Sequence, residues 1–272
     1  FTNRALFALT LPMVLSALLS LSAGIIDSIM VSSVGEAAVG AISLTDPVQI
    51  LLITFFSAVA HGGVVICAQH IGSGNLDRAK CAARQLFYSS TAVALLTSLL
   101  CLPFLSQIIN FLFPNIESSV FENAKTYLSW TLIGIPFYAI GGACCDLLRA
   151  QANSKIPLVM AIVITVLNVM GNAILIYGFK FGVAGAAIST AFSRFAYAVA
   201  GMILIRRKNV QVPLRNLFPI KLDFGILKNI FKIGGSNGIE NALFWITDYP
   251  DSLAGEKLER ANARIGKALL RK

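Results

Sequence analysis

Seven stretches of apolar residues, separated by short polar loops, constrain this 272-residue chain more than any other feature. An α-helix rises about 1.5 Å per residue, so about 20 apolar residues cross the hydrocarbon core of a bilayer. Only 13% of the residues are charged and 56% are hydrophobic, whereas soluble domains carry about 25% charged residues. The sequence therefore predicts an all-α, polytopic membrane protein. The expected spans are residues 5–33, 47–69, 84–112, 126–148, 156–178, 183–205 and 226–246.

These spans divide the chain into four parts. We expect an N-terminal six-helix transmembrane bundle over residues 1–205 and a basic cytoplasmic linker over residues 206–225. Residues 226–246 then form a seventh helix, the first of a second, truncated bundle. After Trp245 the composition changes abruptly, and residues 247–272 are a soluble-looking C-terminal tail that is too charged to be another span. A truncated or chimeric reading frame is the expected explanation of this tail.

Basic residues gather in alternate loops and thereby predict the orientation. Lys and Arg are frequent after the second, fourth and sixth spans, whereas loop 34–46 has none and the other two loops have only Lys125 and Lys180. By the positive-inside rule, the N-terminus lies in the cytoplasm and the protein in the cytoplasmic (inner) membrane. This placement also accounts for the net charge of +9 without nucleic acid, and it makes the lipid bilayer the expected partner.

The sequence contains no pattern typical of an enzyme or of a bound cofactor. HExxH and a phosphate-binding glycine loop are absent, and the five cysteines show no CxxC spacing. We therefore expect no enzymatic activity, no cofactor and no structural metal. His61 lies within the second span, where we expect a packed, helix-facing side chain rather than a proton relay.

Asp27 is the acid in the first apolar span, and its neighbours favour an interior position. A carboxylate at the bilayer centre costs about 2.5–3.5 kcal/mol on insertion scales and usually faces a bundle interior. Ser16, Ser20, Ala23 and Asp27 share one helical face, which forms a small, polar stripe. Pro12 is expected to bend the same span. The alternative is that Asp27 lies near the far interface and is simply solvated.

Asn168 and Asn172 lie four residues apart in the fifth span and therefore share a helical face. Two interpretations of this pair remain open. Their amides can coordinate a cation or bond a substrate. They can equally join neighbouring helices through hydrogen bonds worth about 0.6 kcal/mol on average.

Other polar residues in the apolar spans are expected to be structural. Arg194 should extend to the cytoplasmic side rather than form a buried pair with Asp146. Asp146 and Arg149 are three residues apart and predict a surface ion pair. Asp46 directly precedes Pro47, which favours a helix cap over a binding role.

The segments that carry these residues resemble the multidrug and toxin extrusion (MATE) transporter family. The resemblance covers residues 1–245 and rests on the order and spacing of several segments. They are ALTLPMVLSALLSLSAGIIDSIMVSSVGEAAVGAIS, QHIGSGNLDRAK, LLRAQANSKIPL, LNVMGNAILIYGFKFGVAGAAIST and IGGSNGIENALFW.

The resemblance implies two six-helix bundles that export small, cationic amphipathic molecules by cation-driven alternating access. Asp27 matches the first-helix acid that binds the coupling ion, H⁺ or Na⁺, and Asn168 matches an asparagine of the same site. Thr190 stands where a sixth-helix hydroxyl lines that site, and Glu240 falls near the seventh-helix acid. Asn172 stands where many prokaryotic members have aspartate.

Two alternatives to this exporter remain open. The first is a flippase for a lipid-linked sugar from the same wider superfamily, for which Arg194 is the candidate cavity cation. The second is a non-transporting membrane scaffold, because the chain holds one bundle plus one helix. We expect this chain to take part in transport by pairing with a second half-transporter.

Overall fold

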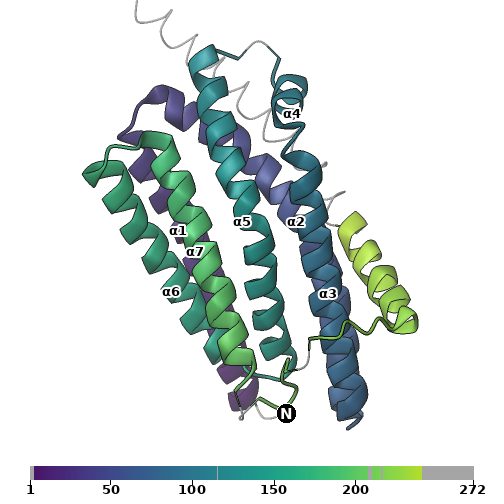
Figure 1. Cartoon of the computed structure of the whole chain (residues 1–272). Coiled ribbons are helices and arrows are strands. Elements are labelled where there is room, and N and C mark those ends of the chain that lie inside the picture. The colour runs from purple at the N-terminus through teal and green to yellow at the C-terminus, as the bar shows by residue number, and fades with distance from the viewer. Residues whose placement is uncertain (1–2, 115, 208–209, 216, 241–272) are drawn as a thin grey trace, which may run out of the picture.

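The computed structural model describes residues 3–114, 116–207, 210–215 and 217–240. Every regular element in this part of the chain is a helix, in agreement with the predicted fold class. Figure 1 shows the long helices running side by side in one bundle. The elements are α1 (Asn3–Ser32), α2 (Glu36–Gly72), α3 (Leu76–Cys101), α4 (Leu105–Leu112), α5 (Ser118–Ala150), α6 (Lys155–Asn172), its π-helical continuation η1 (Ala173–Gly178) and α7 (Gly182–Ile205).

Five of these helices are long and apolar enough to cross a membrane, and a sixth crossing results if α3 and α4 form one broken span. The expected span over residues 84–112 is not one continuous helix, because α3 and α4 meet at a bend of 80°. Pro103 lies in the turn between them, and proline disrupts the hydrogen bonding of a continuous helix. The predicted seventh span is helical over residues 224–240, and its remainder lies outside the described residues.

The second helix begins earlier than the sequence predicts, so Asp46 is not a helix cap. Helix α2 starts at Glu36 after Gly35, whose φ of 135° suits glycine, and it continues through Pro47. Ala41, Ile42 and Thr45 are buried in the bundle. Burial of these residues outweighs the hydrogen bond that Pro47 cannot donate. As a result, Asp46 lies within a membrane-spanning helix.

Helix α5 is the centre of the bundle, where it packs against α7, α2 and α3. Small residues permit the close approach. A Cβ atom at Gly141 would lie 2.2 Å from the ring of Tyr197 on α7. Such close packing of small residues drives helix association in a bilayer, where the hydrophobic effect between helices is absent. Helix α1 packs mainly against α6 and stays largely exposed along its length.

Residues 210–215 and 217–226 pack along one end of the bundle. Val212, Leu214 and Leu217 are buried there. Tyr88 donates a hydrogen bond to the carbonyl of Leu217, and Gln151 receives one from the amide of Val212. These contacts fix the position of the chain that leads from α7 to the helix over residues 224–240.

The helix over residues 224–240 contacts α2 through two glycines. A Cβ atom at Gly62 would lie 2.3 Å from the carbonyl oxygen of Ile230, and one at Gly234 would lie 2.7 Å from the carbonyl oxygen of Ala58. Real Cβ atoms do not approach backbone oxygens so closely. The two helices therefore meet backbone to backbone on the α2 and α3 side of the bundle (Figure 1).

We expect Gly234→Ala to separate these two helices and to destabilise the protein by about 1–3 kcal/mol, the usual cost of overpacking. The neighbouring Gly235 offers a matched control, since a Cβ atom there meets nothing within 4 Å. Gly235→Ala should be neutral or stabilising, because alanine forms helices better than glycine by about 1 kcal/mol. Thermal unfolding in detergent would measure both, and equal stability of the two variants would contradict the close contact.

Candidate functional site

Asp27 lies inside the bundle, half-buried, at the contact between α1 and α6. The amide nitrogen of Asn172 donates a hydrogen bond to its Oδ1 atom, and Asn172 itself is fully buried. The contact forms because the stripe of Ser16, Ser20, Ala23 and Asp27 belongs to the helix that packs on α6. The structure thus brings Asp27 and Asn172 together across 145 residues of sequence.

The side-chain amide of Asn172 has a second polar atom, its carbonyl oxygen Oδ1. The oxygens of an ionised carboxylate only accept hydrogen bonds, so the NH₂ group faces ionised Asp27 and the carbonyl oxygen points elsewhere. That oxygen, Oδ1, is buried and has no hydrogen-bond partner among the described residues. A buried acceptor without a donor costs about 1–3 kcal/mol. An oxygen in this state, next to a carboxylate, is a suitable ligand for a small cation or its water.

Asn168 and Thr190 form a second contact one helical turn away. The amide nitrogen of Asn168 lies 3.2 Å from the hydroxyl of Thr190 on α7, and the Ser189 hydroxyl donates to the Asn168 carbonyl at 2.8 Å. Gly171 makes this possible, because a Cβ atom there would lie 2.3 Å from the Ser189 hydroxyl. Asn168 therefore joins α6 to α7, while Asn172 joins α6 to α1.

Arg194 faces the bundle interior, so the expectation that it extends to the cytoplasmic side was wrong. Its two terminal nitrogens donate to the carbonyl of Thr131 and to Oε1 of Gln49, each at 2.9 Å. Its guanidinium carbon lies 5.5 Å from the ring centre of Tyr138, a distance typical of cation–π contacts. The hydrogen bonds to acceptors on α2 and α5 stabilise the side chain in this position more than extension to the membrane interface would.

Two carboxylates lie close enough to Arg194 to interact with it electrostatically, Asp27 and Asp46. The three side chains come from α1, α2 and α7, and no ion pair among them is within 4 Å in the described structure. With all three ionised, the group carries a net charge of −1. One monovalent cation would neutralise it.

Sequence reasoning missed Asp46 and Gln49 as members of this group. The signal was present, because both are polar residues in or beside an apolar stretch of the second span. Polar residues at such positions usually face the bundle interior. The pattern of Asp46 followed by Pro47 instead favoured a cap.

Glu240 is not gathered with the other candidate residues in the described structure. It is exposed on the helix over residues 224–240. Figure 1 shows this helix on the α2 and α3 side of the bundle, whereas α1 and α6 lie on the opposite side. Its role in cation binding stays a prediction.

Comparison with known proteins decides the family. The model of the MatE family matches residues 12–174, which include Asp27, Asn168 and Asn172. The chain belongs to the MatE family. It is therefore a membrane protein of a transporter family, and the similar curated proteins are named as exporters or resistance proteins.

Two relatives illustrate the extent of this MatE chain. The probable multidrug resistance protein NorM of Thermotoga maritima is 28% identical over 250 residues, which are 89% of this chain and 52% of that protein. The multidrug export protein MepA of Staphylococcus aureus is 28% identical over 232 residues, 85% of this chain and 51% of that protein. The chain thus spans about half the length of the curated relatives it matches.

Solved structures share the fold of this MatE chain. A crystal structure of a MATE transporter in the bent conformation superposes with a TM-score of 0.83 at 21% identity, over 91% of this chain and 55% of that one. A MOP superfamily transporter from Pyrococcus furiosus, described as having a binding pocket of reverse polarity, gives a TM-score of 0.81 at 21% identity, over 90% and 55%. At this identity the likeness concerns the fold.

Proposed function

We propose that the protein containing this chain is a cation-coupled antiporter that exports cationic, amphipathic small molecules by alternating access. The observation that carries the proposal is the interior contact of Asp27 with Asn172 in a MatE bundle. Intramembrane carboxylates that face a bundle interior mark ion pathways in transporters. The relatives named as multidrug exporters support the substrate class.

The coupling ion, H⁺ or Na⁺, binds at Asp27 in this proposal. The carboxylate and the unpaired Oδ1 of Asn172 supply two oxygens for a cation or a protonated water. When Asp27, Asp46 and Arg194 are all ionised, their net charge is −1, so one monovalent ion suffices to neutralise it. A cationic substrate and the ion then compete for the same negative charge, which is the simplest basis of antiport. Pro12 lies inside α1 and supplies a bend at which that helix repacks.

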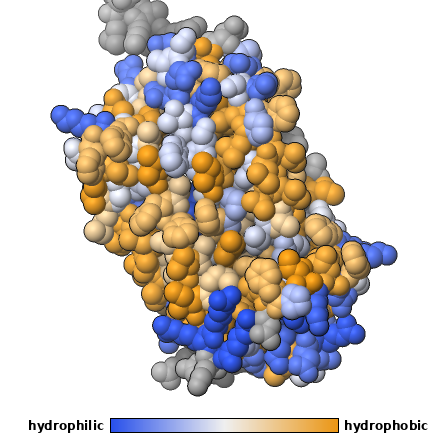
Figure 2. Space-filling model, in the orientation of Figure 1, coloured by the Kyte–Doolittle hydropathy of each residue, from blue (hydrophilic) through white to orange (hydrophobic). Residues whose placement is uncertain are grey.

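Transport also requires a second bundle, since alternating access moves one repeat against another. Most of the exposed surface of α1 is apolar, which suits lipid or a partner bundle. We propose that a second half-transporter, covalently joined or separate, completes the transporter. Figure 2 shows hydrophilic residues gathered at the lower end of the view, where α7 ends in Figure 1. Arg206 and Arg207 directly follow the end of α7, which supports a cytoplasmic location for that end.

One observation favours the flippase as a second candidate function. Arg194 lies in the interior, where a cation would attract an anionic, lipid-linked sugar. Two carboxylates interact with that cation, however, and the group keeps a net negative charge when all three are ionised. Charge balance therefore favours a cationic substrate.

The proposal predicts gradient-driven export. The transport-competent protein that contains this chain, reconstituted in liposomes, should accumulate ethidium when a Na⁺ or a proton gradient is imposed. We expect the gradient of the coupling ion to raise the rate of ethidium accumulation about ten-fold or more over liposomes without a gradient. The reason is that ion binding and substrate binding are coupled in free energy. An ethidium transport rate that neither gradient changes would contradict antiport. Movement of an anionic lipid-linked sugar without ethidium transport would favour the flippase.

A further inference from the structure

A polar cavity, with a volume of about 430 Å³, is lined by residues of α1, α2, α5, α6 and α7. Its charged residues, Asp146 and Arg149, lie in the last turn of α5, which ends at Ala150. A cavity of this size can hold a small organic molecule. Its lining includes one phenylalanine, two tyrosines and three serines, which are Phe56, Tyr138, Tyr197, Ser16, Ser20 and Ser57.

An ion pair forms the polar end of this cavity. Nη1 of Arg149 lies 2.7 Å from Oδ1 of Asp146, and the two side chains remain 32% and 20% exposed. The predicted ion pair is therefore present, but it faces a cavity rather than the open surface. Among the described contacts, the guanidinium donates only this one hydrogen bond. An arginine has five N–H donors, and the second oxygen of Asp146 can also accept.

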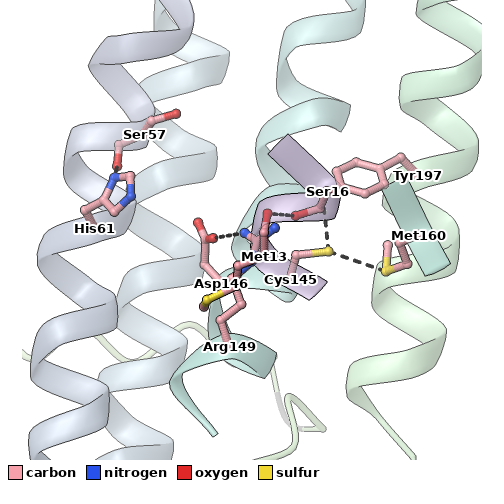
Figure 3. A network of polar contacts seen from close by, with 9 residues as sticks. All are labelled: Met13, Ser16, Ser57, His61, Cys145, Asp146, Arg149, Met160 and Tyr197. Atoms are coloured by element: carbon pink, nitrogen blue, oxygen red, sulfur yellow. Dashed lines mark hydrogen bonds and ion pairs between the residues drawn. The ribbon is translucent and has the colours of Figure 1, made fainter. Parts of the chain in front are cut away.

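His61 completes the polar end from the opposite wall. Figure 3 shows its ring on α2, across from the carboxylate of Asp146 on α5. Nδ1 of His61 lies 2.8 Å from the carbonyl of Ser57, which leaves the far side of the ring to the cavity. The side chain is exposed rather than packed, so the expected packed histidine was wrong.

The charges of this cavity select the kind of molecule that fits. A ligand with a single charge would attract one partner of the ion pair and leave the other unmatched, which is costly in a low-dielectric site. A ligand that carries both signs can place its cation on Asp146 and its anion on Arg149. The two protein charges are in contact, so the two ligand charges must be close together, as in an α-amino acid. The aromatic rings then offer stacking surfaces for an aromatic group.

We propose that this cavity binds aromatic zwitterions whose amine and carboxylate are as close as in an α-amino acid. The site is separate from Asp27. Ser20, at the cavity wall, and Asp27 are seven residues apart on α1, about 10 Å along a helix. Tyr138 lines the cavity, and the guanidinium carbon of Arg194 lies 5.5 Å from its ring centre. Binding in this cavity does not depend on the proposed export reaction.

A matched set of indoles tests the proposal on the whole chain in lipid nanodiscs. Tryptophan carries both charges, tryptamine only the cation and indole-3-propionate only the anion. Equilibrium dialysis with radiolabelled compounds should give a Kd for tryptophan that is about ten-fold or more below that of the other two, since each matched charge contributes. Equal affinities for the three compounds would overturn the proposal.

Two variants locate the binding. Asp146→Asn removes the cation site and should raise the Kd of tryptophan about ten-fold. Gly142→Leu tests the cavity without touching a charge, because Gly142 lines it and a Cβ atom there meets nothing within 4 Å. We expect a similar loss with unchanged thermal stability. Tryptophan binding that survives Gly142→Leu would contradict the site.

Asp27→Asn separates this inference from the proposed function. The variant should leave the Kd of tryptophan within about two-fold of the original, because the two sites are independent at this distance. A loss of tryptophan binding in Asp27→Asn would place the ligand at Asp27 and overturn the cavity assignment. Binding that behaves as expected, together with failure of gradient-driven ethidium transport, would refute the antiporter alone.

Discussion

We expect Asp27→Asn to abolish ion-coupled export by the transport-competent protein, with a loss of about ten-fold or more in the rate of ethidium transport. Asparagine keeps the size of the side chain and can still accept the hydrogen bond of Asn172. It cannot change charge, however, so it can neither bind a proton nor balance a Na⁺ ion. The bundle should therefore fold while the exchange of ion and substrate is lost.

Transport in liposomes and thermal unfolding together test this prediction. The matched control is Asp77→Asn, because the Asp77 side chain is 94% exposed and pairs with Lys80 at the surface. Exposed pairs contribute about 0–1 kcal/mol, so this variant should transport like the original protein. Full gradient-driven export by Asp27→Asn would show that Asp27 is not the coupling residue.

Arg194→Met is expected to destabilise the bundle by about 3–5 kcal/mol, the usual cost of removing one partner from a buried charged group. The change leaves Oε1 of Gln49 and the carbonyl of Thr131 without the donors that Arg194 supplies. It also leaves Asp27 and Asp46 without the nearby cation. Arg194→Lys keeps the positive charge and should lose less stability than Arg194→Met.

Thermal unfolding can be followed with a thiol-reactive dye, because Cys67, Cys144 and Cys145 are buried and free. The control is Arg207→Met, since Arg207 is exposed after the end of α7 and such changes usually stay within about 0.5 kcal/mol.

A double variant tests the electrostatic link between α1 and α7. If Asp27 and Arg194 stabilise each other, Asp27→Asn combined with Arg194→Met should cost less than the sum of the two single changes. Additive costs would mean that the arginine acts only through Gln49 and Thr131. A stability of Arg194→Met equal to that of the original protein would contradict its interior role altogether.

Much of the fold could be predicted from the sequence, because long apolar runs require helices in a bilayer. The break between α3 and α4 was missed, since residues on both sides of it are equally apolar. Pro103 was the available signal. The early start of α2 was missed for the opposite reason, because the local cap pattern of Asp46 and Pro47 was outweighed by burial of Ala41 and Ile42.

The candidate site was predictable only in part. The spacing of Ser16, Ser20 and Asp27 indicates which face of α1 is polar, and Asp27 on that face contacts Asn172 of α6 in the structure. The environment of Arg194 could not be found in this way. Its partners Gln49 and Thr131 lie 145 and 63 residues away in the sequence, and position within a span alone favours an interfacial arginine.

The sequence by itself determined the helices, their membrane character and the basic end of the bundle, because hydrophobicity and loop charge are local properties that add along a chain. Only the tertiary structure decided which polar side chains meet. Asp27 accepts a hydrogen bond from Asn172, and Arg194 donates one to Gln49 in the bundle interior. Asp146 and Arg149 line a cavity. These choices depend on helix packing, since a buried polar group takes whichever partner the neighbouring helix places within reach.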